Sequence, residues 1–185
     1  WTDELWSAAG DGDLGPTTVY TYLTHNLNVP ATFVAIVITG DLSQFNAWYI
    51  DDVSLTPVNA ALPFYESFDG SELPAYWTTQ NEGEGIVDRW SVVPYSAAGG
   101  VPNEVMCWYQ YVNPGTTRLV LPAVNTIGRT VVGMSFKHRY LYMGTGAVQL
   151  KVQTSTNGTD WTDELWSAAG DGDLGPTTVY TYLTH

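Results

Sequence analysis

Residues 147–154 read AVQLKVQT, and this stretch decides the fold class. Its apolar residues stand at every second position, with polar residues between them. Strict alternation is typical of a β-strand that buries one face, because successive side chains point to opposite sides of a sheet. Residues 134–142 alternate in the same way, whereas residues 32–39 form a nearly continuous apolar run. That run predicts a central strand that is covered on both faces.

Further strands are expected along the rest of the chain, at 17–23, 47–55, 64–68, 89–94, 104–111 and 118–121. Clusters of Gly, Pro, Asn and Asp separate them, for example at 11–13, 113–115 and 157–158. A helical period is missing from these stretches. Many short strands punctuated in this way predict an all-β fold, a sandwich of two antiparallel sheets.

The chain contains a long repeat. Residues 1–25 and residues 161–185 both read WTDELWSAAGDGDLGPTTVYTYLTH, at an offset of 160 residues. Folding does not require identity at exposed positions, so the copies share a recent origin or an engineering step. A natural array, an engineered boundary and a misassembled repetitive gene all stay open. The simplest interpretation is a polymer of near-identical 160-residue units, each of single-domain size.

Composition narrows the classes of partner. The chain has 19 acidic and 6 basic residues, which gives a net charge of −13. Nucleic acids and anionic lipid surfaces attract Lys and Arg, so we expect no nucleic acid partner and no membrane insertion. Cys107 is the single cysteine and has apolar and aromatic neighbours. It is expected to be a small core residue.

Three motifs carry a family resemblance. Residues 155–161 read STNGTDW after a strand that reads LKVQTS, residues 48–53 read WYIDDV, and residues 64–68 read FYESF with Trp77 downstream. Together they resemble the MAM-like, cleaved-adhesin and choice-of-anchor domains of bacterial surface proteins. The loop between Trp77 and Trp90 departs from the family because it holds few Asp or Asn residues. The resemblance implies a jelly-roll β-sandwich and an extracellular location, either secreted or at the cell surface.

The resemblance also sets the phase of the repeat. It implies that residues 1–57 are the C-terminal strands of one module and residues 64–185 the N-terminal strands of the next. Residues 58–63 are the joint, which flanking prolines make semi-rigid. Either residues 26–57 fold back onto their own chain as a circular permutation, or the next chain completes the open edge by donor-strand complementation. The stiff joint favours the second arrangement.

A calcium site is the sharpest candidate. Asp51 and Asp52 interrupt an apolar strand, where two adjacent carboxylates cost free energy unless they are compensated. Calcium takes about six to eight oxygen ligands. In the resembling family this pair and a carboxylate of the opening strand hold a structural Ca²⁺, which implies Asp51, Asp52 and Glu66, with Asp69 as a weaker addition. Alternatively, one Asp caps a turn and the other faces solvent.

We expect that the protein is not an enzyme. His138 lies on an apolar strand face, which is typical of a core histidine, and the sequence contains no H-E-x-x-H, G-x-S-x-G or phosphate-loop motif. Aromatic residues are plentiful and are the candidates for a sugar-stacking face. Trp90, Trp108 and Trp161 are expected in the core, and Tyr109, Tyr111, Tyr140 and Tyr142 at the surface.

Two hypotheses of function remain. The first is a structural repeat module of an extracellular filament, stalk or cell-surface array, assembling head-to-tail with copies of itself by strand complementation. Repetition and a stiff joint favour it. The alternative is an adhesin or carbohydrate-binding module that binds surface glycans, which the aromatic content and the resemblance favour.

Overall fold

The computed structural model describes residues 32–57, 64–110, 114–127, 132–143 and 148–183. These residues form β-strands and connecting turns, and within them no helix is long and apolar enough to cross a membrane. The strands are β1 (Phe33–Gly40), β2 (Phe45–Pro57), β3 (Phe64–Glu66), β4 (Thr78–Glu82), β5 (Trp90–Val93), β6 (Glu104–Trp108), β7 (Gly115–Val120), β8 (Val132–Tyr142), β9 (Val148–Ser155), β10 (Thr162–Gly170) and β11 (Leu174–Leu183).

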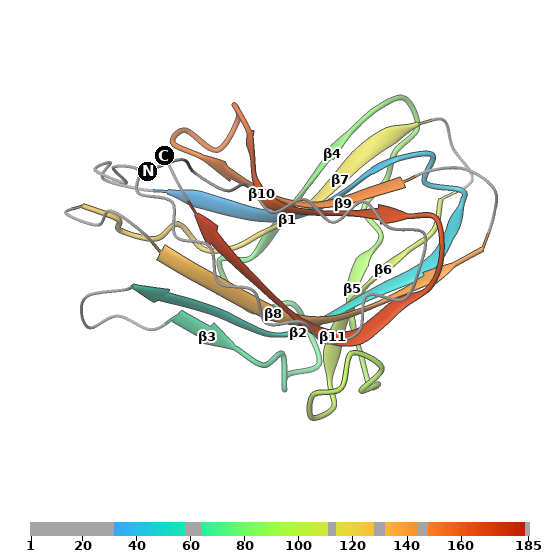
Figure 1. Cartoon of the computed structure of the whole chain (residues 1–185), viewed down its shortest axis with the longest axis horizontal. Coiled ribbons are helices and arrows are strands. Elements are labelled where there is room, and N and C mark those ends of the chain that lie inside the picture. The colour runs from blue at the N-terminus through green and yellow to red at the C-terminus, as the bar shows by residue number, and fades with distance from the viewer. Residues whose placement is uncertain (1–31, 58–63, 111–113, 128–131, 144–147, 184–185) are drawn as a thin grey trace, which may run out of the picture.

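Two sheets pack face to face (Figure 1). The five-stranded sheet has the order β10-β9-β1-β7-β4, and the six-stranded sheet has the order β11-β8-β2-β6-β5, with β3 paired to β2. All described strand pairs are antiparallel. The predicted all-β sandwich of two antiparallel sheets is therefore confirmed.

The core lies between the sheets and follows the alternation in the sequence. β9 points Val148, Leu150 and Val152 inward, and β8 buries every second residue from Val132 to Tyr140. β1 is buried on both faces, as its apolar run predicts: Ile36 packs in the main core, while Ala35 and Val37 lie in a separate small cluster. Burial on both faces explains why β1 does not alternate.

β1 and β2 lie among the strands of the rest of the chain. β1 lies between β7 and β9, and β2 lies between β8 and β6. Residues 33–57 thus occupy the interior of both sheets beside strands of residues 64–185, which is the fold-back arrangement. The joint does not prevent it, because β2 pairs with β3 directly across residues 58–63, Leu55 opposite Phe64.

Two described strands were not expected. β4 reads TTQNE and β10 reads TDELWSAAG, and both are rich in residues with weak β-propensity. Both lie at an edge of the five-stranded sheet, where one side of the strand faces no neighbour. The strand expected at 17–23 lies outside the described residues, but its copy 160 residues later lies within β11.

Candidate functional site

The adjacent acids of β2 sit at a break in the strand ladder. The register between β2 and β8 shifts between Asp51 and Ser54, which marks a β-bulge. Asp52 has a φ of 48°, in the left-handed region that Asp tolerates better than most residues. The bulge turns the two carboxylates into different surroundings.

Asp51 points into the protein. It is 0% exposed, its Oδ1 accepts a hydrogen bond from the Asp52 N–H at 2.7 Å, and its Oδ2 has no hydrogen-bond partner. A Cβ built on Gly100 would lie 1.4 Å from that Oδ2, so the loop before β6 covers the carboxylate closely. Burial, with the nearby charges of Asp52 and Glu104, raises the pKa of Asp51 to about 6.

Asp52 faces the outside of the six-stranded sheet. Its Oδ2 pairs with Nζ of Lys137 at 2.5 Å, and its Oδ1 accepts a hydrogen bond from the Tyr65 hydroxyl. Although partial burial opposes them, these hydrogen bonds lower the pKa of Asp52. Both oxygens of Asp52 are therefore already engaged by protein groups.

The other two predicted ligands hold local turns. Oε1 of Glu66 accepts the Phe68 N–H at 2.8 Å, and Oδ2 of Asp69 accepts the Ser67 hydroxyl at 2.9 Å. Among the described residues, no group of three or more His, Cys, Asp or Glu side chains is placed to hold a metal ion. No three of the four predicted ligands are therefore brought together here, and Asp51 is the one among them with a buried oxygen that has no hydrogen-bond partner. The calcium site stays a prediction.

Glu104 is a buried acid that the sequence analysis missed. It stands at the start of β6, one position from the Val105–Ile50 pair, and is 0% exposed. Its two carboxylate oxygens each accept a backbone N–H at 2.8 Å, from Ala97 and Ala98. It fixes the loop that covers Asp51. Its only sequence signal is an acid at the head of an apolar strand.

His138 is a core residue, as expected. It is 3% exposed, and its Nδ1 accepts a hydrogen bond from Nε1 of Trp48 at 3.2 Å. Trp166 and Phe136 pack around the imidazole. Burial lowers the pKa of His138 to about 4, so the ring is neutral at pH 7. Cys107 is also fully buried, which agrees with the core role expected for it.

The expectations for the aromatic residues need correction. Tyr140 is 0% exposed and donates its hydroxyl to the Gly170 carbonyl at 3.0 Å, so it is a core residue. Trp108, expected in the core, is 40% exposed. Trp90 is buried as predicted, and its Nε1 donates to Thr117 at 2.9 Å. Tyr111 lies outside the described residues.

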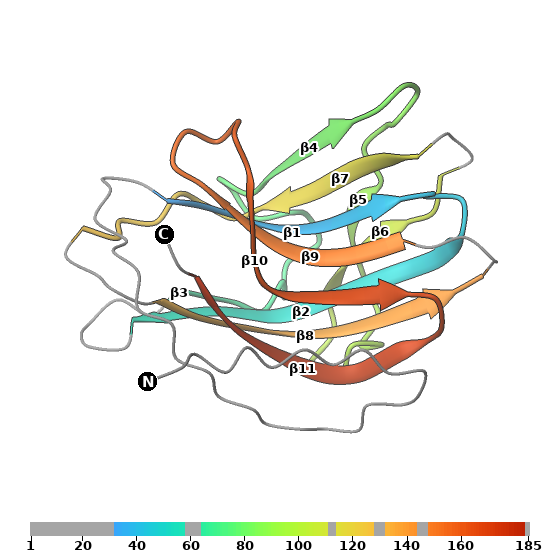
Figure 2. The ribbon, with the colours of Figure 1, turned by 45° about the horizontal axis from the view of Figure 1, so that its top comes forward.

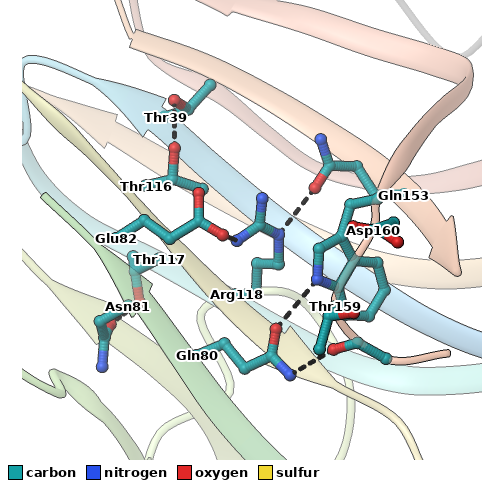
Figure 3. A network of polar contacts seen from close by, with 12 residues as sticks. Thr39, Gln80, Asn81, Glu82, Thr116, Thr117, Arg118, Gln153, Thr159 and Asp160 are labelled. Carbon is teal, nitrogen blue, oxygen red and sulfur yellow. Dashed lines mark hydrogen bonds and ion pairs between the residues drawn. The ribbon is translucent and has the colours of Figure 1, made fainter.

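A polar network covers the outer face of the five-stranded sheet (Figure 3). Its centre is Arg118 of β7, whose Nη1 pairs with Oε1 of Glu82 at 2.6 Å and whose Nε donates to Gln153 at 2.8 Å. The Arg118 side chain is 6% exposed, against 60% for Glu82. A guanidinium with two fixed partners is held rigidly on this face.

Trp161 closes the network from above. Its ring lies over the Arg118 guanidinium, with Cζ 5.4 Å from the ring centroid, and its Nε1 donates to Gln80 at 3.0 Å. It also packs on the small apolar cluster that contains Ala35 and Val37. Trp161 is thus not in the main core, but it covers the small apolar cluster on the outer face of the sheet.

The STNG turn positions Trp161. The Ser155 hydroxyl accepts the N–H of Gly158 at 2.9 Å, and Oδ1 of Asn157 accepts the N–H groups of Thr159 and Asp160 at 2.9 and 2.8 Å. Gly158 in turn offers its carbonyl to Nε2 of Gln80. These local bonds explain why Ser, Asn and Gly stand at these positions.

No family model, curated protein or solved structure matches the chain.

Proposed function

We propose that the chain is a structural repeat module of an extracellular filament, stalk or cell-surface array. The observation that carries the proposal is the agreement between the period and the fold. The strands from Phe33 to Leu183 form both sheets once, and residues 26–185 make up one period of 160 residues. The unit of repetition is therefore one folded unit, as in other tandem arrays.

The resemblance to MAM-like, cleaved-adhesin and choice-of-anchor domains supports an extracellular or cell-surface location. The STNG motif forms a tightly bonded turn, and the sandwich agrees with what those domains imply. The net charge of −13 favours repulsion between neighbouring units, which keeps an array soluble and extended. A structural calcium ion at Asp51 is part of the proposal, with the unpartnered Oδ2 as its support.

The proposed partners are copies of the same chain in head-to-tail order. The expected complementation through residues 26–57 now has an obstacle, because β1 and β2 occupy interior positions in both sheets. Exchanging them would break five strand pairings at once, those of β1 with β7 and β9 and those of β2 with β3, β6 and β8. Contacts through the sheet edges, where strands present unpaired backbone groups, are easier to form.

A carbohydrate-binding module is the second candidate. Its support is the outer face of the five-stranded sheet, where Gln80, Arg118 and Gln153 lie beside Trp161. Amide, guanidinium and indole groups on one face are typical of sugar recognition. All of these groups have protein partners in this structure, and for that reason we rank the structural role first.

Electron microscopy of a chain extended by one whole period tests the structural role. We expect two equal lobes in a fixed line, because each period folds into its own sandwich. A glycan array probed with the single chain tests the second candidate, with Arg118→Met as the variant and Lys151→Met as the matched control. Specific glycan binding that only Arg118→Met removes, with collapsed and irregular two-period particles, would favour the binding module instead.

A further inference from the structure

The second copy of the repeated segment, residues 161–185, lies at the edges of the two sheets rather than between other strands. Residues 161–185 contain β10 and β11, which lie at neighbouring edges of the two sheets (Figure 2). Within the sheet order, β10 pairs with β9 alone and β11 pairs with β8 alone. The segment can therefore leave the sandwich without separating any other two strands.

Specific side chains hold this segment in place. Asp163 pairs with Lys151 at 2.7 Å and accepts a hydrogen bond from Gln153 at 2.6 Å. Trp166 stacks on Trp48 in the core, with 6.5 Å between ring centroids. Further contacts come from Trp161 to Arg118 and Gln80, from Glu164 to Thr154, from Gly170 to Tyr140 and from Asp173 to Tyr142.

All of these partners lie between residues 48 and 154, a part of the chain that occurs once. Residues 1–25 carry the same side chains in the same order, with Trp1, Asp3, Glu4 and Trp6 matching Trp161, Asp163, Glu164 and Trp166. Both copies can therefore make the same contacts. Because there is one set of partners, only one copy can make them at a time.

The connectivity permits either copy to take the place. The end of β11 and the start of β1 lie at the same end of the sandwich (Figures 1 and 2). Sheets about 10 Å apart and strands about 4.8 Å apart give a span of roughly 15 Å between these points. Leu23, the copy of Leu183, is joined to Thr32 by nine residue steps, which reach up to roughly 30 Å.

We propose that residues 1–25 and residues 161–185 compete within the chain for the β10–β11 place. A short tether gives each copy an effective concentration of about millimolar, which exceeds that of a neighbouring chain in dilute solution. In an array, each such segment would complete either the sandwich before it or the sandwich after it. Only this extension to an array rests on the proposed function.

A double-mutant cycle tests the competition. Trp166→Ala removes a core ring from one copy, and Trp6→Ala is the matched change in the other. If the copies are equivalent, each single variant lowers the Tm by less than about 2 °C and the double variant by roughly 6–12 °C. A Trp166→Ala variant that melts as low as the double variant, or fails to fold, overturns the proposal.

Hydrogen exchange of the same variants gives a second readout. Each substitution makes the two otherwise identical segments distinguishable by mass. In Trp166→Ala we expect amide protection in residues 1–25, and in Trp6→Ala in residues 161–185. Fast exchange of residues 1–25 in both variants overturns the proposal. Sedimentation of Trp166→Ala should show monomers at every concentration, and rescue that appears only with dimers would overturn the intrachain assignment.

Discussion

Nε1 of Trp48 donates a hydrogen bond to Nδ1 of His138 across 3.2 Å, inside the core between the two sheets. The bond requires a neutral imidazole with Nδ1 as its acceptor. It joins β2 to β8, whose strands were expected to belong to different modules. Protonation of His138 at Nδ1 would remove this acceptor, and with it a hydrogen bond between the two strands.

The first prediction concerns acid. Burial lowers the pKa of His138 from 6.5 to about 4, so the stability that depends on the neutral ring is complete above pH 6.5 and is lost as the pH falls towards 4. Between pH 7 and pH 5 we expect the free energy of unfolding of wild type to fall by about 2 kcal/mol relative to that of His138→Leu, in which the other titrating groups, Asp51 among them, still act. Urea unfolding at both pH values checks this. Equal losses for wild type and variant would contradict it.

The second prediction concerns Asp51. Its folded-state pKa is raised to about 6, so the stability due to its protonated form is complete below pH 3.8 and lost as the pH rises through 6. At pH 8 with a chelator, Asp51→Asn should therefore raise the free energy of unfolding by about 2 kcal/mol. Calcium should stabilise wild type but not Asp51→Asn, by about 2.7 kcal/mol at a hundredfold excess over Kd. Glu72→Gln is the exposed control, outside the predicted ligand set.

Calorimetric melting in calcium and in chelator decides this second prediction. A wild-type curve that responds to neither condition removes calcium from the account. A response that persists in Asp51→Asn would place the ion elsewhere.

The third prediction concerns the loop before β6, which packs over the Asp51 carboxylate. A Cβ on Gly100 would lie 1.4 Å from Oδ2 and 2.5 Å from Cγ of that residue, so Gly100→Ala must displace the loop or the carboxylate. We expect a loss of about 1–3 kcal/mol. Gly172→Ala is the matched control, because its Cβ would meet nothing within 4 Å. Equal denaturation midpoints for the two variants would show that the contact is not tight.

The fourth prediction concerns the outer face. Arg118→Met removes the guanidinium that joins Glu82, Gln153 and Trp161, and leaves Gln153 without its donor. We expect a loss of about 1–3 kcal/mol, against about 0.5 kcal/mol for Lys151→Met, which removes a cation that is more exposed than Arg118. Guanidinium unfolding measures both. An Arg118→Met variant as stable as Lys151→Met would show that the network does not contribute to the stability of the fold.

Many strands of the sandwich were predictable from the sequence, because a strand that buries one face has an apolar residue at every second position. Buried and less buried residues alternate along β8 and β9. In β1 a continuous apolar run indicates that both faces of the strand are covered. The edge strand β4 carries no such signal, since its polar residues need no burial on the outer side. β10 was missed because few of its described side chains are apolar; Trp166, which stacks on Trp48, and Ala168 pack against the main core.

The site was less predictable because its groups meet through tertiary contacts. Asp51 and Asp52 were singled out as adjacent acids, but the bulge that separates them depends on the pairing of β2 with β8. Glu104 reaches the same region from β6, more than 50 positions along the chain. The spacing of acids in the sequence therefore could not show that the predicted ligands face different partners.

Single-molecule stretching of a chain extended by several whole periods tests most directly the claim that the 160-residue repeat and the sandwich are the same unit. Each unit should unfold in one step, and a fully extended stretch of 160 residues spans roughly 55 nm, so the account predicts force peaks separated by about 50 nm of contour length. One additional peak should appear for each added period. A featureless extension, or peaks whose spacing does not follow the period, would contradict the account.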